Sequence, residues 1–224
     1  IQWLLVQHHK LKSPVAGPLL RRYCDMLDPG ERQTLGNFIF LAWLDRDLAH
    51  KYTEAEARSQ AKQLAQTMHY GQSIAEAEQF HYQQLKSERA SAVADKGILA
   101  VAGACCGADV VRRVRSYLTE WYGYRAAQCK ALVGMLSAMD EAAAIGYLLS
   151  VSHRFPTKGI RDEAEKCVAE LAERKGWTID ELADRTMPTA GLDDDGKLEL
   201  DFGSRRFSVQ VSPALVPVLT DETG

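Results

Sequence analysis

The chain has 224 residues, of which 46% are hydrophobic and 25% are charged. This globular balance excludes a disordered tail, a collagen-like fibre and a low-complexity linker. The formal net charge of -3 excludes a polycation built along its whole length for nucleic acid. A chain of this length can bury a core without a disulfide or a metal, and it fits one or two domains.

The first residues and the cysteines indicate a compartment. The apolar run Ile1–Val6 is too short for a signal peptide or a membrane span. We interpret it as the end of a helix, and the chain as a piece of a longer protein. No Cys-x-x-Cys pair occurs among the five cysteines, which are Cys24, Cys105, Cys106, Cys129 and Cys167. We therefore predict buried, reduced thiols in a cytoplasmic protein with no membrane partner, the alternative being a redox or soft-metal pair at Cys105–Cys106.

Helix start signals recur over the first 186 residues. A capping residue is followed three positions later by an acid at Asp28, Thr53, Ser73 and Thr178. Further helix starts are predicted near Ser13, Ser87, Gly107, Gly123, Asp140 and Thr157. Gly176 is expected to end the helix that precedes it.

Three of these helical segments carry specific expectations for burial. The run Phe38–Leu44 is apolar on every face, so we expect neighbours on several sides of it. The helix that Ser73 opens is polar, with Phe80 and Leu85 as its main anchors. The stretch 87–106 is rich in Ala and Gly, which allows helix backbones to approach closely.

After Pro188 the hydrophobic period changes from about 3.6 to 2, which is the period of a strand. Two alternating segments, at 198–202 and 207–211, flank a turn at Gly203–Ser204 and predict a hairpin. A short strand at 190–192 and a turn at 193–196 are expected before it. A further strand at 215–219 is confined to a sheet edge by its prolines.

The predicted fold is mainly α, with a small C-terminal antiparallel β meander. Paired in sequence, the helices form units of roughly 35–40 residues, the size of HEAT and armadillo repeats. We predict a HEAT-like array of antiparallel helix pairs over 1–186 and a β-hairpin element over 187–224. A closed bundle and an irregular α domain are the alternatives.

No motif in the sequence nominates an active site, a cofactor site or a metal site. There is no phosphate-binding loop, no nucleophile elbow and no H-E-x-x-H pattern. His69 and His81 lie one helix apart, but we favour ordinary surface or helix-end roles for them. The acidic run at 193–196 lacks the spacing of a calcium loop. We predict no catalytic, cofactor-binding or metal-binding residue, and no cofactor.

The one remaining candidate is a basic segment between Gly107 and Lys130. Arg112 and Arg115 share a helix face with Thr119, and two tyrosines follow nearby. A basic patch with aromatic residues can follow a phosphate backbone, although most such faces are simply solvated. The candidate residues for binding nucleic acid or a partner are Arg112, Arg113, Arg115, Arg125 and Lys130.

The C-terminal part of the chain resembles a known family. The residues that carry the resemblance are Leu171–Arg185, Pro188–Asp193, Leu198–Gly203 and Arg205–Phe207. They resemble the helical-repeat region of large bacterial WGR-domain proteins, called molybdate-metabolism-regulator-like (MolR-like). This resemblance implies a long cytoplasmic protein with a HEAT-like α repeat followed by a small β element. It implies no catalytic residue in this chain.

Three functions remain open on the sequence. The leading hypothesis is a non-enzymatic helical scaffold that binds a protein partner or other domains of its own chain, with regulation as one use of that binding. The first alternative is a nucleic-acid-associated regulator segment that uses the basic residues from Arg112 to Arg125. The second alternative is part of an enzyme that other domains complete.

Overall fold

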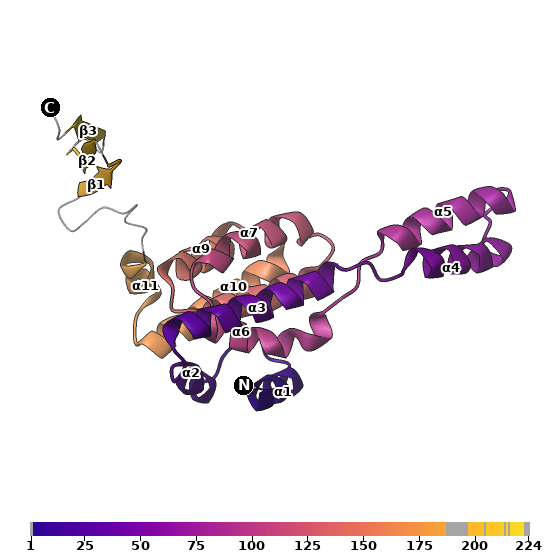
Figure 1. The fold of residues 1–224 in the computed structure, drawn as a ribbon, viewed down its shortest axis with the longest axis horizontal. Coiled ribbons are helices and arrows are strands. Elements are labelled where there is room, and N and C mark those ends of the chain that lie inside the picture. The colour runs from indigo at the N-terminus through magenta and orange to yellow at the C-terminus, as the bar shows by residue number, and fades with distance from the viewer. Residues whose placement is uncertain (1, 187–196, 204, 213, 215, 222–224) are drawn as a thin grey trace.

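A computed structural model describes residues 2–186, 197–203, 205–212, 214 and 216–221. The chain is mainly helical, with a small three-stranded antiparallel sheet at its C-terminal end, as the sequence predicts. Figure 1 shows a body of packed helices from which one helical hairpin projects. The helices are α1 (Gln2–Leu11), α2 (Pro18–Cys24), α3 (Pro29–Leu48), α4 (Glu54–Thr67), α5 (Ile74–Ser87), the 3-10 helix η1 (Val93–Ile98), α6 (Leu99–Cys105), α7 (Asp109–Trp121), α8 (Ala126–Ala138), α9 (Ala142–Arg154), α10 (Lys158–Lys175) and α11 (Ile179–Arg185).

Helix α8 is the centre of the body. It packs against α6, α7, α9, α10 and η1, so it has neighbours on every side. Its residues from Gln128 to Ala138 are almost all buried, and Leu132, Met135 and Leu136 are completely inaccessible to solvent. Because burial of apolar area contributes about 25 cal/mol per Å², this helix supplies much of the body's stability.

Small residues bring backbones together in the body, as the Ala- and Gly-rich stretch predicts. A Cβ atom at Gly103 of α6 would lie 2.7 Å from the carbonyl oxygen of Met135 in α8. A Cβ atom at Gly36 of α3 would lie 2.6 Å from the amide nitrogen of Cys106. Both distances are shorter than van der Waals contact, so a larger residue at either position must push two helices apart.

Several predicted helix ends are confirmed. Thr53, Ser73 and Thr178 each form a capping box with the glutamate three residues later. The Asp28 carboxylate accepts hydrogen bonds from the amides of Gly30 and Glu31 at the start of α3. Gly176 ends α10 with a positive φ of 67°, which glycine adopts at little cost.

Three predicted starts are wrong. The helix expected at Ser13 begins only at Pro18, after Gly17. The Asp140 carboxylate does not cap α9; it forms ion pairs with Arg21 and Lys175, and α9 begins at Ala142. The helix expected from Ser87 is a 3-10 helix followed by the short α6.

The expectations for burial in α3 and α5 need correction. Phe38 is 68% exposed and Leu41 is also exposed, so α3 is buried on one side only, the side that carries Phe40 and Trp43. In α5 the side chain of Phe80 faces solvent, while Ala77, His81 and Tyr82 are the buried residues. Composition overestimates burial in both helices because few elements are close enough to cover them.

Helices α4 and α5 form a hairpin that projects from one end of the body (Figure 1). They pack on each other through a separate small cluster of Ala57, Ala61 and Tyr82, with Tyr52 and Leu85 at its margin. The two connections to the body lie side by side as a short antiparallel bridge between His50 and Arg89. We call this pair of connections, 49–51 and 88–90, the neck.

The C-terminal sheet has the order β1 (Lys197–Asp201), β2 (Arg206–Val211) and β3 (Pro217–Asp221). Leu198 pairs with Val209 and Leu200 with Phe207, so the predicted alternation sets the register. β3 lies at a sheet edge, as its prolines predict, although it begins at Pro217. The predicted strand at 190–192, the turn at 193–196, Ser204 and Leu215 lie outside the described residues. The HEAT-like repeat stays a prediction with which this arrangement is compatible.

Candidate functional site

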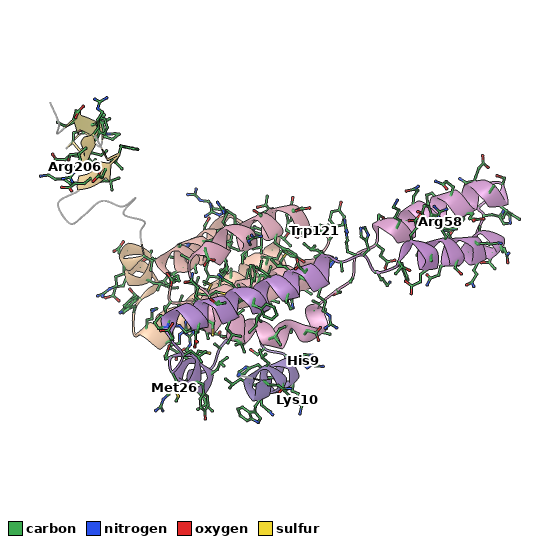
Figure 2. The ribbon with its side chains drawn as sticks, viewed as in Figure 1. His9, Lys10, Met26, Arg58, Trp121 and Arg206 are labelled. Carbon is green, nitrogen blue, oxygen red and sulfur yellow. The ribbon has the colours of Figure 1, made fainter. Side chains whose placement is uncertain are left out.

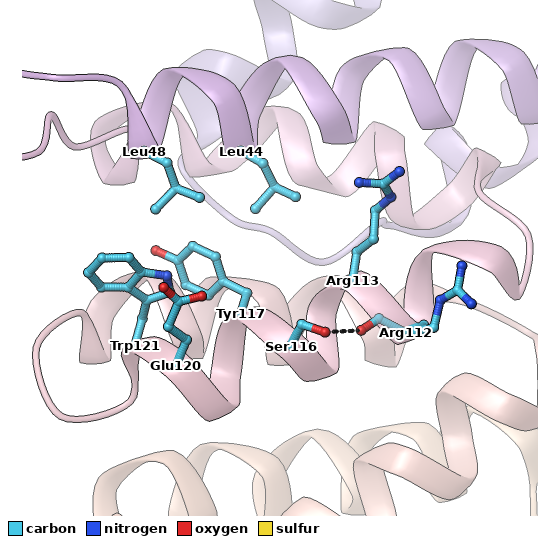
Figure 3. A pocket seen from close by; sticks show the side chains of 8 residues that line it. All are labelled: Leu44, Leu48, Arg112, Arg113, Ser116, Tyr117, Glu120 and Trp121. Atoms are coloured by element: carbon cyan, nitrogen blue, oxygen red, sulfur yellow. Dashed lines mark hydrogen bonds between the residues drawn. The ribbon is translucent and has the colours of Figure 1, made fainter.

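The basic residues of α7 lie in two different grooves. Arg112 and Arg113 line a groove of about 420 Å³ between α7 and the C-terminal half of α3. Figure 3 shows Leu44 and Leu48 on the α3 side, facing Tyr117 and Trp121 on the α7 side. The groove therefore has a basic end and an aromatic end, with Glu120 beside the aromatic end.

Arg115 lies on the other side of α7, towards α9. Its guanidinium group stands over the ring of Tyr147, 4.8 Å from the ring centre, which is a cation–π arrangement. It lines a second groove together with Arg154 and Thr119. Arg112, Arg113 and Arg115 are all exposed, and none forms an ion pair within the part of the chain that the structure describes.

The structure does not bring the other two candidate residues to this surface. Lys130 is half-buried against Gly159, near the start of α10. Arg125 turns inward, and its side chain is only 10% exposed. The five residues predicted as a binding set therefore occupy four separate environments.

Arg125 belongs to a buried polar network built on Asp47 of α3. One Asp47 carboxylate oxygen accepts hydrogen bonds from the Tyr117 hydroxyl at 2.5 Å and from Arg125 Nε at 3.0 Å. The other accepts from the backbone amide of Ala92 at 2.8 Å. Asp47 is fully buried, so these donors replace the water that its charge has lost.

The same arginine also fastens the neck. Arg125 Nη2 donates to the carbonyl oxygens of Asp47 and Ala90, one on each side of the point where the hairpin leaves and rejoins the body. Its guanidinium group also stands 5.5 Å from the ring centre of Trp121. Figure 2 shows Trp121 at the end of the body from which the hairpin extends. The network therefore connects α3, α7, the start of α8 and the 88–90 segment of the neck.

The surroundings of Tyr117 and Arg125 keep each of these two side chains in one charge state near neutral pH. Burial raises the pKa of Tyr117 well above its usual range, and its hydrogen bond to Asp47 adds to this effect. Burial alone disfavours a charged Arg125, but its contacts with Tyr117 and Asp47 outweigh that cost and raise its pKa. The tyrosine stays a neutral donor and the arginine stays a cation. Neither residue therefore loses its hydrogen bonds to Asp47 by titrating near neutral pH.

The sequence contains one signal for this network. Asp47 follows Phe40 and Trp43 at helical spacings of seven and four, on the same buried face of α3. An acid on an apolar face requires a buried partner. Asp45, two residues earlier, is exposed, so the helical phase separates the two acids.

The far end of the hairpin carries apolar side chains without neighbours from the body. Its turn, residues 68–73, is held by His81, whose Nε2–H donates to the carbonyl oxygen of Met68 at 2.8 Å. Around this turn Tyr70 is 77% exposed, and Met68, Ile74 and Phe80 are also exposed. We call these four residues the hairpin tip.

The groups that were candidates for metal or redox chemistry have other surroundings. All five cysteines are buried, free thiols, as predicted. Burial raises the pKa of Cys106 and of Cys129 to about 12, so both are poor nucleophiles at neutral pH. His81 uses its Nε2 for the Met68 carbonyl, not for a metal. Over the described residues, no group of three or more His, Cys, Asp and Glu side chains is arranged to hold a metal ion.

Comparison with known proteins gives one relative among curated sequences. The chain is 36% identical over 98 residues to the uncharacterized protein YehI of Escherichia coli K12. The matched stretch is 44% of this chain and 8% of YehI, so the chain spans a small part of that relative. No protein-family profile matches the chain, and no solved structure matches it significantly. None of the helices in the described segments is long and apolar enough to span a membrane.

Proposed function

We propose that this chain is a helical scaffold segment of a larger cytoplasmic bacterial protein. Its role is to bind a protein partner or other domains of its own chain, without catalysis of its own. The observation that carries the proposal is the α4–α5 hairpin, which is anchored at its neck and exposes apolar residues at its tip (Figure 1). A regulatory role would follow if binding at the tip changes with conditions in the cell.

The neck holds the hairpin in one direction, and so it holds the tip in one orientation for binding. The backbone bonds of the neck and the two carbonyl contacts of Arg125 restrain the direction in which the hairpin points. A preorganised surface loses less conformational entropy on binding than a flexible one. Exposed aromatic and aliphatic side chains at the tip are the residue types that act as anchors in protein interfaces.

We propose that the chain belongs to the WGR-domain, MolR-like group of bacterial proteins. The match to a small stretch of the long E. coli protein supports a segment of a larger bacterial chain. Five buried free thiols fit a reducing compartment and so support a cytoplasmic location. The HEAT-like repeat belongs to the same proposal, and the antiparallel packing of α4 on α5 and of α9 on α10 supports it.

Site-specific crosslinking tests the tip. A photo-crosslinking amino acid replaces Tyr70 in the full-length protein, expressed in its own bacterium. We expect discrete adducts, either with a partner or with another domain of the same chain, identified by mass spectrometry. The same label at Phe38, an exposed aromatic residue of α3, serves as the control. Adding Ile74→Asp to the Tyr70-labelled protein should remove the adducts, because an unpaired carboxylate is costly in an apolar interface.

Two results would contradict the scaffold proposal. One is the absence of adducts at Tyr70 when the protein is abundant and folded. The other is a set of adducts that is identical for Tyr70 and Phe38 and insensitive to Ile74→Asp, which would show only random collisions.

One observation favours a second candidate function, nucleic-acid binding. Arg112, Arg113 and Arg115 are exposed without ion pairs among the described residues, and Arg154 lies near Arg115. We propose binding assays with labelled DNA and RNA at low and high salt as its test. Arg112→Glu with Arg115→Glu should abolish a salt-sensitive signal. The absence of binding at low salt would remove this candidate. The enzyme alternative has no such observation in its favour.

A further inference from the structure

A second surface of the body, remote from the hairpin in sequence, has the form of a binding groove. Helix α1 packs on η1 and α6, and α2 packs on α6, so each helix turns one side away from the body. A groove of about 470 Å³ lies between the two helices. Its lining is mainly apolar and includes Trp3, Leu4, Leu11, Leu19, Leu20 and Tyr23.

The large side chains of this groove are not covered. Trp3 is 63% exposed, Leu11 66% and Leu19 62%, so the groove holds three bulky apolar residues in contact with solvent. Apolar surface that is gathered in one concavity is a sign of a binding site, whereas isolated apolar residues on a surface are ordinary.

A second depression adjoins the groove. Leu4 and Tyr23 line both, and the second, of about 330 Å³, also contains Met26 and Leu27. Met26 is the most exposed of the large apolar residues in this region. Two connected depressions along α1 and α2 give an elongated shape. A ten-residue helix such as α1 is about 15 Å long, so the groove matches about three turns of a bound helix.

The segment that forms the groove, residues 1–24, carries charges of one sign. Residues 1–24 contain no Asp and no Glu, but they include Lys10, Lys12, Arg21 and Arg22. Lys10, Lys12 and Arg22 are exposed and form no ion pair with any described residue. Figure 2 labels Lys10 and Met26, which mark the basic and apolar components of this part of the body.

Three acids on neighbouring elements form ion pairs with other cations. Asp25 holds Arg32, Asp95 holds His9 and Arg46, and Asp140 holds Arg21 and Lys175. These three acids therefore do not pair with Lys10, Lys12 or Arg22, which lie on the segment that forms the groove. An apolar groove with an unneutralised basic rim is complementary to an apolar stripe with acidic flanks.

We infer that the α1–α2 groove binds an acidic amphipathic helix of a protein partner. Large apolar residues of that helix, spaced at i, i+3, i+4 and i+7, fill the groove, and its glutamates and aspartates face Lys10, Lys12 and Arg22. A concave, elongated groove favours a helix over a lipid surface, because a bilayer cannot enter the space between two helices. The inference rests on the proposed scaffold function but uses a different surface from the hairpin tip.

The test uses the 224-residue chain and synthetic peptides of about 18 residues. The probe is a fluorescent helix with Leu and Phe at the four spaced positions and Glu on its polar face. One control peptide has the same composition in scrambled order, and another has Lys in place of Glu. We expect saturable binding of the acidic helix only, measured by fluorescence anisotropy, and weakened by added salt because the flanking charges are exposed.

Two variants locate the binding. Leu19→Asp should weaken binding about tenfold or more, because the carboxylate loses water without gaining a partner. Lys10→Glu with Lys12→Glu should weaken it and remove most of its salt dependence. Phe38→Asp, a matched change at an equally exposed aromatic residue of α3, should leave the affinity unchanged. Circular dichroism confirms the fold of each variant, which is expected to survive because the altered side chains are exposed.

Each other occupant gives a distinct result that would overturn the inference. Sedimentation with phosphatidylserine vesicles, but no binding of the peptide, would assign the groove to a membrane surface. A dimer that forms with increasing concentration and is lost in Leu19→Asp would assign it to a second copy of the chain. Equal affinity for the acidic and the basic peptide, or no effect of Leu19→Asp, would show that the groove does not bind the helix. The crosslinking at Tyr70 is independent of all these results, so the two proposals fail separately.

Discussion

The helical body and the α4–α5 hairpin are both made of packed helices, but different forces hold them together. The body buries large side chains such as Trp43, Leu118, Leu136 and Leu148 in one continuous cluster. The hairpin buries little more than alanines and Tyr82. Its helices begin with complete capping boxes, and Arg58 pairs with Glu54 within α4. The body thus depends on tertiary packing, whereas the hairpin depends on local helix signals and on its neck.

Because of this difference, the body supplies most of the stability, whereas the hairpin leaves more of its surface available for binding. A region with few buried side chains opens at lower free energy than the core and leaves more of its surface for partners. The buried polar network is the junction between the two regions. Four experiments test whether the boundary lies where the structure places it, in order of decreasing expected effect.

Removal of the buried carboxylate should have the largest effect. Asp47→Ala leaves Arg125 buried without its partner and leaves the Tyr117 hydroxyl and the Ala92 amide without an acceptor. We expect a loss of about 3–5 kcal/mol in the free energy of unfolding, measured by urea denaturation. The hairpin should also lose its fixed direction. Pulsed electron–electron double resonance between spin labels on the tip and on the body would detect this as a broader distribution of distances.

The matched control for this experiment is Asp45→Ala, since Asp45 is exposed on the same helix. It should change stability by no more than about 0.5 kcal/mol. Equal effects at positions 45 and 47 would show that the network contributes nothing specific.

A cavity in the centre of α8 should affect the body alone. Leu136 is completely buried, so Leu136→Ala removes transfer free energy and leaves a void, at a cost of about 2–5 kcal/mol. Amide hydrogen exchange should become faster throughout α8 and α10. Exchange that occurs by local opening of α4 and α5 should keep its rate, because the hairpin cluster shares no side chain with the main core.

If instead the hairpin amides accelerate as much as those of α8, the two regions unfold as one unit and the contrast drawn between them is wrong. Leu41→Ala, at an exposed position of α3, is the control for the substitution itself.

Removal of the two caps should affect the hairpin alone. Thr53→Ala and Ser73→Ala each delete a side-chain acceptor for a backbone amide at the start of a helix. We expect about 1 kcal/mol for each, seen as faster exchange in α4 and α5 with little change in the overall urea midpoint. Thr119→Ala, which removes an exposed hydroxyl from the interior of α7, should have a smaller effect. A drop in the overall midpoint as large as that of Leu136→Ala would contradict this assignment.

The smallest effect concerns pH. The pKa of Glu56 is lowered by hydrogen bonds from the Thr53 amide and hydroxyl, and that of Glu76 by those from the Ser73 hydroxyl and amide. A pKa lower in the folded state means that the stabilisation is complete above the unfolded value and is lost as pH falls through the folded value. We therefore expect amide shifts of the first turns of α4 and α5 to change as pH is lowered from about 5 to about 3.

Glu56→Gln with Glu76→Gln provides the control, because glutamine keeps an acceptor oxygen but does not titrate. The acid-dependent change should vanish in this variant. Its persistence would assign the effect to other carboxylates.

Local signals explain how much of this fold the sequence could predict. Capping boxes at Thr53, Ser73 and Thr178 and the helix stop at Gly176 depend on neighbouring residues only, and all were correct. The alternation at 198–202 and 207–211 depends on a two-residue period and set the strand register correctly. Such features require no knowledge of what packs where.

The errors concern features that depend on tertiary neighbours. Phe38 and Phe80 are apolar, yet nothing in the sequence shows which face of a helix lacks a neighbour. Asp140 has the residue type of a cap, but Arg21, which is far away in the chain, takes its carboxylate. The basic candidate set failed to form one surface because residue type does not distinguish Arg125, drawn inward by Asp47, from the exposed Arg112.

The neck also has a consequence for how such a protein can change. The Ala90 amide donates to the Ala49 carbonyl oxygen at 2.7 Å, so the two ends of the intervening 50–89 segment already meet. The segment therefore behaves as an insert: its length and sequence can vary while the core around α8 keeps every one of its large side chains. A hairpin of another length, joined at the same two alanines, would exchange one recognition element for another. The same helical body would support each of these hairpins.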